Sequence, residues 1–174
     1  MKAWRRTARR GLLALLLGLL LALAALPALA REAGDAGELV RIARELGLDD
    51  VDGFVEAVVS VCRAGRLPPR YITKGAAREL GWRPGRDLCV FAPGRILGGD
   101  RFHNRERRLP EAPGRRWYEA DLDHACGRRG PKRLVFSSDR LVFVTVDHYR
   151  SFRRVPCPQS APSASDRNSA PPPR

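Results

Sequence analysis

Two carboxylates lie on the same face of a strand expected within residues 114–121. Side chains alternate across a strand, so Trp117, Glu119 and Asp121 share one face. On a strand of a strongly basic protein, a carboxylate is either half of a salt bridge or a group that transfers a proton. We interpret Asp121 as the salt-bridge partner, Glu119 as the reactive group and Trp117 as a packing residue beside them.

Positive charge dominates the 174-residue chain, which has 32 Lys and Arg against 19 Asp and Glu and a formal net charge of +13. Five of these basic residues and no acids fall in residues 1–30, so residues 31–174 hold 27 basic and 19 acidic residues, a net charge of +8. A basic protein suits a polyanionic partner such as nucleic acid, anionic lipid or an acidic inhibitor. Solubility alone is the alternative explanation of the charge.

The N-terminus has the pattern of an export signal. Basic residues within 2–10 precede an apolar run over 11–26, and Ala28 and Ala30 follow the small-x-small rule of signal peptidase. We predict that residues 1–30 are a signal peptide cleaved after Ala30, and that the protein is secreted with no stable membrane anchor. A retained transmembrane anchor is the alternative, and the arginine pairs are a weak indication of twin-arginine export.

The chain has four cysteines: Cys62, Cys89, Cys126 and Cys157. An even number of cysteines in an exported chain predicts two disulfides, with free buried thiols as the alternative. No spacing of cysteine and histidine matches a metal site, so we expect neither a metal nor a cofactor.

Helical patterns come first along the chain and strand patterns later. Residues 31–50 form an N-terminal extension with a short helical pattern, and further helices are expected over 52–64, 74–80 and, as a turn or two, 87–92. Strands are expected over 96–100, 115–122, 133–137, 141–146 and 151–155, with a polar loop over 102–110. Residues 156–174 are rich in Pro and Ser and are expected to be a disordered tail.

This order predicts an α+β fold in which N-terminal helices pack on one face of a twisted antiparallel β-sheet. The other face of the sheet is then free for an active site, and Glu119 is expected there.

Short motifs in a fixed order resemble the barnase-type secreted bacterial ribonucleases, which prefer guanosine. The similarity covers about residues 51–155, here interpreted as the ribonuclease domain. Its main motifs are Tyr71 to Lys74, Leu80 to Trp82, Ala92 to Gly94, Gly98 to Asp100, Asn104 to Glu106, Glu119 to Asp121, Ser137 to Asp139 and Asp147 to Tyr149.

The resemblance implies a metal-independent endoribonuclease that cleaves single-stranded RNA on the 3′ side of guanosine. The ribose 2′-OH attacks its own phosphate to give a 2′,3′-cyclic phosphate, which is then hydrolysed. A catalytically silent RNA-binding protein on the same fold is the alternative. A basic membrane-active protein is a third class, but the long amphipathic basic helix it needs is missing.

Catalytic roles follow from the same resemblance. Glu119 matches the general base and His148 the general acid. Lys74, Arg129 and Arg133 match the cations around the phosphate.

Two acids are expected to support this site. Asp121 is the expected partner of Arg129 and Arg133, whose guanidinium groups it would hold in place. Asp100 is the second supporting acid. His124 has no role in the family pattern, so we expect an ordinary surface residue there, with a second catalytic histidine as the alternative.

The substrate-binding residues implied by the resemblance form a loop and two nearby aromatic side chains: His103, Asn104, Arg105, Glu106, Phe102 and Tyr149. One carboxylate, that of Glu106, can accept both adjacent N–H donors of guanine. Asn104 is expected to hold the loop's shape. His103 stands where the family has a small hydroxyl residue, and Arg128 where it tends to have an aromatic one.

The topology of the family implies the disulfides Cys89–Cys126 and Cys62–Cys157. The family also implies a monomer and an acidic inhibitor of the barstar type inside the producing cell; this charge-steered pair is a standard example of electrostatic association.

Overall fold

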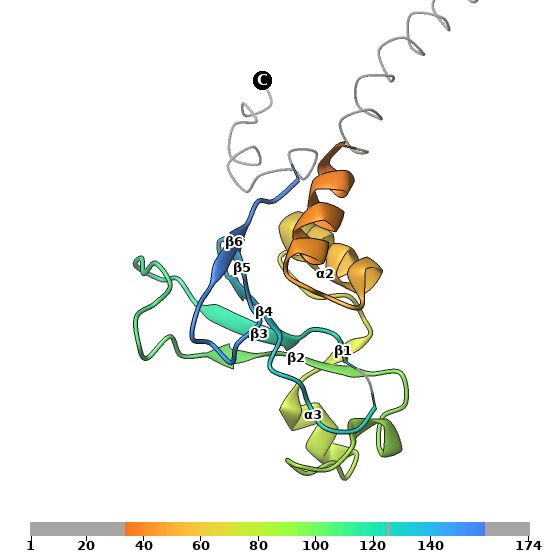
Figure 1. Cartoon of the computed structure of the whole chain (residues 1–174). Helices are drawn as coiled ribbons and strands as arrows, with labels where there is room; N and C mark the ends of the chain where they lie inside the picture. The colour runs from red at the N-terminus through yellow and green to blue at the C-terminus, as the bar shows by residue number, and fades with distance from the viewer. Residues whose placement is uncertain (1–33, 125, 159–174) are drawn as a thin grey trace, which may run out of the picture.

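The computed structural model describes residues 34–124 and 126–158 (Figure 1). Helical residues 34–45 precede α2 (Val51–Ala64), β1 (Tyr71–Ile72), α3 (Lys74–Glu79), a 3₁₀ turn (Leu88–Val90), β2 (Ile96–Phe102), β3 (Trp117–Asp121), β4 (Arg133–Ser137), β5 (Val142–Thr145) and β6 (Arg153–Val155). The predicted signal peptide and the tail beyond residue 158 lie outside the described residues. Within the described part of the chain, no helix is both long and apolar enough to cross a membrane.

The strands form one six-stranded sheet in the order β1 to β6. β2 to β6 pair antiparallel with their sequence neighbours, as expected, and the α+β prediction is confirmed. β1 differs, because it was not predicted and it pairs parallel with β2. A two-residue strand is too short to show an alternating pattern, and its parallel pairing depends on the crossover through α3.

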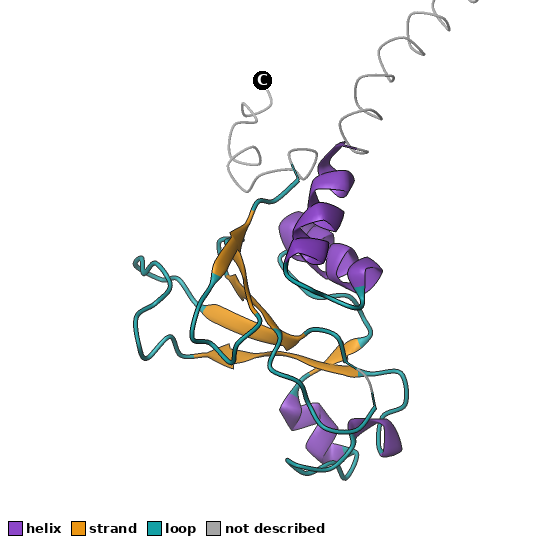
Figure 2. Ribbon diagram, viewed as in Figure 1, coloured by secondary structure: helices purple, strands orange, loops and turns teal. Residues whose placement is uncertain are grey.

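The N-terminal extension packs into the same core as the rest of the domain. Leu39 and Ile42 are buried in one cluster with Phe54 of α2 and Leu134 of β4. Figure 2 shows the extension helix and α2 together on one side of the strands. Residues 34–45 are therefore a structural part of this domain, and the helix predicted there is confirmed.

Capping residues define both ends of α2. The Asp50 side chain accepts a hydrogen bond from the Gly53 N–H, which satisfies one of the free donors of the first turn. Gly65 ends the helix in the left-handed conformation at φ 69°, which glycine adopts without strain.

Alternation along β3 gives the sheet two different faces. Ala120 packs toward α2 in the main core, whereas Trp117 packs on the opposite face with Leu109 and Val135. Trp117 is buried, and its ring meets the Phe143 ring edge-on at 5.7 Å. The expectation that Trp117 packs beside the site is consistent with this contact.

α3 lies apart from the other helices, next to β2 (Figure 2). Its Ala77 packs with Trp82, Leu88 and Leu97 in a small second core. The Thr73 side chain accepts from the Ala76 N–H and begins the helix, as predicted.

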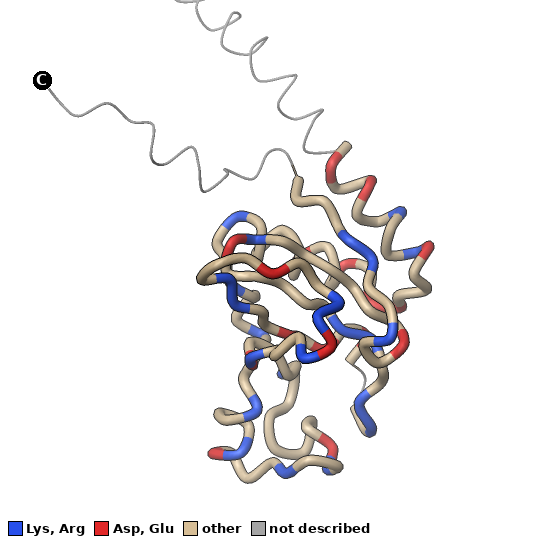
Figure 3. Tube along the Cα trace, turned by 90° about the vertical axis from the view of Figure 1, so that its left-hand side faces the viewer, with Lys and Arg blue, Asp and Glu red and all other residues tan. Residues whose placement is uncertain are grey.

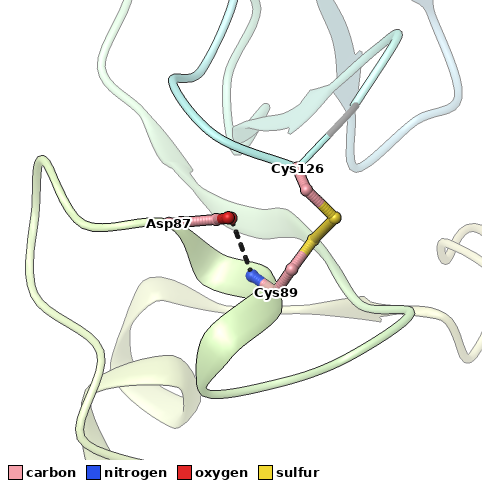
Figure 4. A group of neighbouring side chains, drawn as sticks. All are labelled: Asp87, Cys89 and Cys126. Atoms are coloured by element: carbon pink, nitrogen blue, oxygen red, sulfur yellow. Dashed lines mark hydrogen bonds between the residues drawn. A yellow bond between two sulfur atoms is a disulfide. The ribbon is translucent and has the colours of Figure 1, made fainter.

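Two disulfides join distant segments, and both have the predicted pairing. Cys62 of α2 is bonded to Cys157, and Cys89 of the 3₁₀ turn is bonded to Cys126 in the loop after β3. Asp87 lies beside the second disulfide and accepts from the Cys89 N–H (Figure 4). These three side chains are close enough together to resemble a metal site, but sulfurs bonded to each other are not the thiolates that bind metals.

Candidate active site

Glu119 lies in the middle of β3, on the sheet face opposite α2, and only 8% of its surface is exposed. Lys74 Nζ donates to one carboxylate oxygen at 2.6 Å, and the Tyr149 hydroxyl donates to the other at 2.6 Å. The donors come from α3 and from the loop after β5. The carboxylate is therefore oriented from two sides by charge-assisted hydrogen bonds.

Tyr149 links this carboxylate to the predicted substrate loop. Its ring stacks on Phe102 with 5.2 Å between the ring centroids. Burial, followed by the hydrogen bond to Glu119, raises the pKa of Tyr149 above its ordinary value. The hydroxyl therefore stays protonated at physiological pH and remains a donor. The sequence predicted only an aromatic surface here, so this hydrogen bond is an additional finding.

Asp100 sets the position of Lys74. Its Oδ2 accepts from the Lys74 backbone N–H at 2.9 Å, at the start of α3. Asp100 is also the cross-strand partner of Glu119, across a bulge at Gly99. Asp100, on the neighbouring strand, thus directs the Lys74 side chain toward the Glu119 carboxylate. This contact is the way in which Asp100 can support the site, as predicted for it.

Asp121, two positions farther along β3, contacts both predicted phosphate-binding arginines. Arg129 donates from Nε and Nη2 to its two oxygens at 2.6 Å each, and this pairing raises the pKa of Arg129. Arg133 Nε lies 3.0 Å from Asp121 Oδ1, an ion-pair distance without the alignment of a hydrogen bond. Its Nη1 donates to the carbonyls of Gly130 and Lys132. One buried carboxylate therefore holds two guanidinium groups side by side.

Residues 103–109 form a loop whose shape depends on Asn104. Its side-chain amide donates to the Leu109 carbonyl at 2.9 Å and accepts from the Leu109 N–H at 3.0 Å. Asn104 is 5% exposed and has φ 44°, a left-handed conformation that asparagine tolerates better than most residues. His103, Arg105 and Glu106 remain exposed around it.

Replacing Asn104 by Ala is expected to loosen this loop. The substitution leaves the Leu109 N–H and C=O buried without partners, at a cost of about 1–3 kcal/mol. We expect faster hydrogen exchange of the Leu109 amide and a raised KM for RNA, with the sheet unchanged. Asn104→Asp is the matched variant, because its carboxylate keeps the acceptor and loses the donor, so an intermediate effect is expected. Unchanged exchange in Asn104→Ala would remove Asn104 from this role.

A cleft of about 400 Å³ lies between this loop and the loop after β5. It brings together predicted substrate-binding residues and the predicted general acid: Phe102, His103, Asn104, Arg105, Glu106, His148 and Tyr149. A nucleobase fits a cleft that has aromatic walls and polar loop groups.

The loop that carries His148 is organised by Asp147. Its carboxylate accepts hydrogen bonds from the hydroxyls of Ser151 and Thr145 and from the backbone N–H groups of Arg150 and Ser151. These hydrogen bonds, that of the Ser151 hydroxyl first, hold the pKa of Asp147 well below its usual range. His148 and Tyr149 both have positive φ, at 55° and 66°. The turn exposes the imidazole while Tyr149 points inward. Neither the role of Asp147 nor that of Thr145 was identified from the sequence.

The predicted site residues thus fall into adjoining groups on one face of the sheet. Lys74, Glu119 and Tyr149 contact one another directly, and Asp121 joins the two arginines. His124 is half-buried, with its Nε2 3.9 Å from Cys89 Sγ. Figure 3 shows Lys and Arg along the whole described trace, with Asp and Glu interspersed among them.

Removing the Cys89–Cys126 bond by a double Ser substitution is expected to affect both stability and activity. The bond closes 37 residues, which corresponds to about 3–4 kcal/mol in the chain-entropy model. It also tethers the loop that carries Arg129, so the activity per folded molecule should fall. Urea denaturation and initial rates of RNA cleavage measure the two effects.

Removing Cys62–Cys157 is the matched control. It should lower stability without a loss of activity per folded molecule, because this bond joins α2 to the chain end, away from the arginines. Equal losses of activity in the two variants would contradict the tethering role.

Comparison with known proteins identifies relatives of most of the domain. The profile of a family described as ribonuclease matches residues 56–156. A protein of Heyndrickxia coagulans named ribonuclease is 46% identical over 109 residues, which cover 62% of this chain and 97% of the relative. Proteins of Bacillus intermedius and Bacillus pumilus, also named ribonuclease, are 46% identical over the same length, but the match spans 65% of each of these relatives.

Proposed function

This chain belongs to the barnase-type bacterial ribonucleases, and from that membership we propose that it cleaves single-stranded RNA on the 3′ side of guanosine without a metal or cofactor. The observation that carries the proposal is the arrangement around Glu119. A buried, doubly hydrogen-bonded carboxylate lies beside a pair of arginines and next to a cleft of nucleobase size.

In the first step, Glu119 accepts the proton of the ribose 2′-OH. The 2′-oxygen forms a bond to phosphorus, the bond from phosphorus to the 5′-oxygen breaks, and His148 donates a proton to that leaving oxygen. Lys74 and Tyr149 fix the carboxylate so that one orientation faces the substrate. The products are a 2′,3′-cyclic phosphate and a free 5′-hydroxyl.

The second step hydrolyses the cyclic phosphate with the roles reversed. His148, now neutral, accepts a proton from water, whose oxygen attacks phosphorus. The bond to the 2′-oxygen breaks, and Glu119 returns a proton to it.

Arg129 and Arg133 stabilise the extra negative charge on phosphorus in both steps, and Lys74 contributes from α3. Preorganised cations in a partly buried site act most strongly on charge that develops during the reaction. Asp121 holds both guanidinium groups before substrate arrives, so little reorganisation is required.

Guanine is proposed to bind in the cleft beside residues 103–106. Glu106 accepts from the two adjacent N–H donors of guanine, backbone N–H groups serve its O6, and Tyr149 and Phe102 supply aromatic surface. Arg105 and His103 complete the rim, where both side chains are exposed.

The organisation of the whole chain is proposed accordingly: signal peptide 1–30, extension 31–50, ribonuclease domain 51–155 and tail 156–174. We propose that the mature protein is secreted, which the two disulfides support, and that it is a monomer. An acidic barstar-type inhibitor in the producing cell is the proposed protein partner.

The test is incubation of residues 31–174 with RNA and, separately, with DNA in excess chelator. Cutting of RNA to ends that carry guanosine 2′,3′-cyclic phosphate supports the proposal. Binding without cutting indicates a catalytically silent RNA-binding protein. Cutting only after metal is added contradicts the mechanism.

A further inference from the structure

The two segments that meet at the Cys89–Cys126 disulfide bring four metal-binding side chains together. In one segment Asp87 stands two positions before Cys89, and in the other His124 stands two positions before Cys126. A carboxylate oxygen of Asp87 and the two sulfurs all lie within 4.8 Å of one another. On the histidine side, His124 Nε2 lies 3.9 Å from Cys89 Sγ. The fold therefore assembles a donor set that the spacing of residues along the chain does not show.

Two sulfurs, an imidazole nitrogen and a carboxylate oxygen are the ligands of a tetrahedral zinc ion. The bond lengths of zinc to these atoms place any two ligand atoms of the tetrahedron about 3.3–3.8 Å apart. The 3.9 Å between His124 Nε2 and Cys89 Sγ is already close to such a spacing. Sulfur and nitrogen donors also favour Zn²⁺ over Mg²⁺ and Ca²⁺, which prefer oxygen.

The disulfide is what keeps the two sulfurs from binding a metal in the structure. Their Cα atoms are 5.6 Å apart, so rotation of the two side chains can separate the sulfurs without moving the backbone. Cys126 is exposed and Cys89 is half-buried, which leaves this bond open to attack by a reductant. The other disulfide is better covered, because Cys62 is only 2% exposed.

Asp87 and His124 are already directed at this place. The Asp87 carboxylate accepts from the Cys89 N–H at 3.0 Å and from the Gly127 N–H, and Figure 4 shows it pointing toward the space beside the disulfide. Two accepted hydrogen bonds leave lone pairs free, and such bonds orient the carboxylates that bind metals. His124 lies close enough to Asp87 for their charges to interact.

We propose that, once the Cys89–Cys126 disulfide is reduced, Cys89, Cys126, His124 and Asp87 bind one Zn²⁺ ion. A dithiol reductant gives two electrons and two protons to the disulfide, its own thiols form a disulfide, and both cysteines become thiols. When Zn²⁺ binds, each thiol releases its proton to solvent and its sulfur bonds to the metal. The inference goes beyond the proposed function and gives the metal no part in RNA cleavage.

A bound Zn²⁺ ion would join the same two segments that the disulfide joins. The loop that carries Arg129 follows directly after Cys126, so zinc keeps this loop attached to the 3₁₀ turn in the reduced protein. Reducing compartments hold exposed cysteine pairs as thiols. The same four residues thus connect these segments under oxidising conditions through sulfur alone and under reducing conditions through a metal.

The test titrates the protein with Co²⁺, which takes the place of Zn²⁺ and absorbs visible light. The disulfides are first reduced without air by a water-soluble phosphine, which takes oxygen from water and leaves no free thiol to compete for the metal. One equivalent of Co²⁺ should then give the intense visible bands of a tetrahedral ion and the near-ultraviolet charge transfer of cobalt–sulfur bonds. Zn²⁺ should displace it, and the oxidised protein should give neither signal.

Two double variants form a matched pair, because each lacks all disulfides after reduction. The reduced Cys62→Ser/Cys157→Ser protein should give the full cobalt–sulfur signal, since it keeps the proposed ligands. The reduced Cys89→Ser/Cys126→Ser protein should give none. A charge-transfer signal of equal size in the two variants, or its absence from both, would overturn the site.

The two remaining ligands are tested by affinity for Zn²⁺, measured in competition with a coloured chelator. His124→Ala and Asp87→Ala should each weaken binding by at least about tenfold, since loss of a residue that only supports a ligand already costs that much. His103→Ala is the matched control for the histidine, because His103 is exposed in another loop and its loss should leave the affinity unchanged. Unchanged affinity in His124→Ala or Asp87→Ala would contradict the proposed ligand set.

Circular dichroism of the same samples separates loss of the fold from loss of the site. If the reduced Cys62→Ser/Cys157→Ser protein is unfolded without metal, Zn²⁺ should restore its folded spectrum, because metal binding and folding are coupled. Zn²⁺ should not do so for Cys89→Ser/Cys126→Ser. Recovery in neither variant, or in both, would count against zinc binding by these four residues.

Discussion

Glu119→Gln is expected to lower the rate of the cyclising step by about 10²–10⁴-fold, the usual contribution of a general base. The amide has almost the same shape: its oxygen can still accept from Lys74 and its NH2 can donate to the Tyr149 hydroxyl oxygen, but it cannot take a proton from the ribose. Single-turnover cleavage of GpU measures the effect. Thermal melting and RNA binding by the same variant should stay close to those of the natural protein.

Glu79→Gln is the matched control for this change. Glu79 is an exposed glutamate at the end of α3, so its amide variant should cleave GpU at the natural rate. A Glu119→Gln protein that turns over within about threefold of the natural rate would exclude Glu119 as the base, since removing a general base costs far more. A Glu119→Gln protein that does not fold would mean that the residue is structural.

Asp121→Asn is expected to destabilise the protein by about 3–5 kcal/mol, because breaking a buried ion pair leaves charge without a partner. The side chains of Asp121 and Arg133 are each only 4% exposed, and Arg129 is bonded to the same carboxylate. Urea denaturation at neutral pH measures the loss. Guanosine 3′-monophosphate should also bind more weakly, since both guanidinium groups lose the contact that positions them.

Asp139→Asn is the matched control, because it breaks another close Arg–Asp pair at the surface. Asp139 is 49% exposed and pairs with Arg115 at 2.6 Å, so its loss should cost about 1 kcal/mol or less. Adding Arg133→Met to Asp121→Asn should restore part of the lost stability by removing one buried charge. Similar stabilities for Asp121→Asn and Asp139→Asn would contradict the bracing role.

The sequence was sufficient for the elements whose patterns are local. Alternation over residues 115–122 predicted which side of β3 faces the core, and the ring of Trp117 does pack on the face it shares with Glu119. The prediction of where β2 ends was less accurate. Phe102 was expected in the polar loop, but it pairs with Trp117 as the last residue of the strand, because aromatic packing with Tyr149 extends the ladder beyond the apolar pattern.

The contacts that complete the site could not be derived from spacing. The hydrogen bond from Tyr149 to Glu119 joins residues 30 positions apart, and that from Lys74 joins residues 45 apart. The disulfide pairing followed from family resemblance, since four cysteines alone allow three connectivities. The short parallel strand β1 likewise depends on the fold of α3 over the sheet edge.

The Cys62–Cys157 bond has a consequence for survival outside a cell. The exposed loop between β2 and β3 holds Arg105, Arg107 and Arg108, each a target for a trypsin-like protease. The bond encloses 95 positions of the chain, this loop included, so a single cut there produces two pieces that remain covalently joined. Because β2 and β3 also pair with each other on either side of the cut, a nicked molecule keeps its strands together.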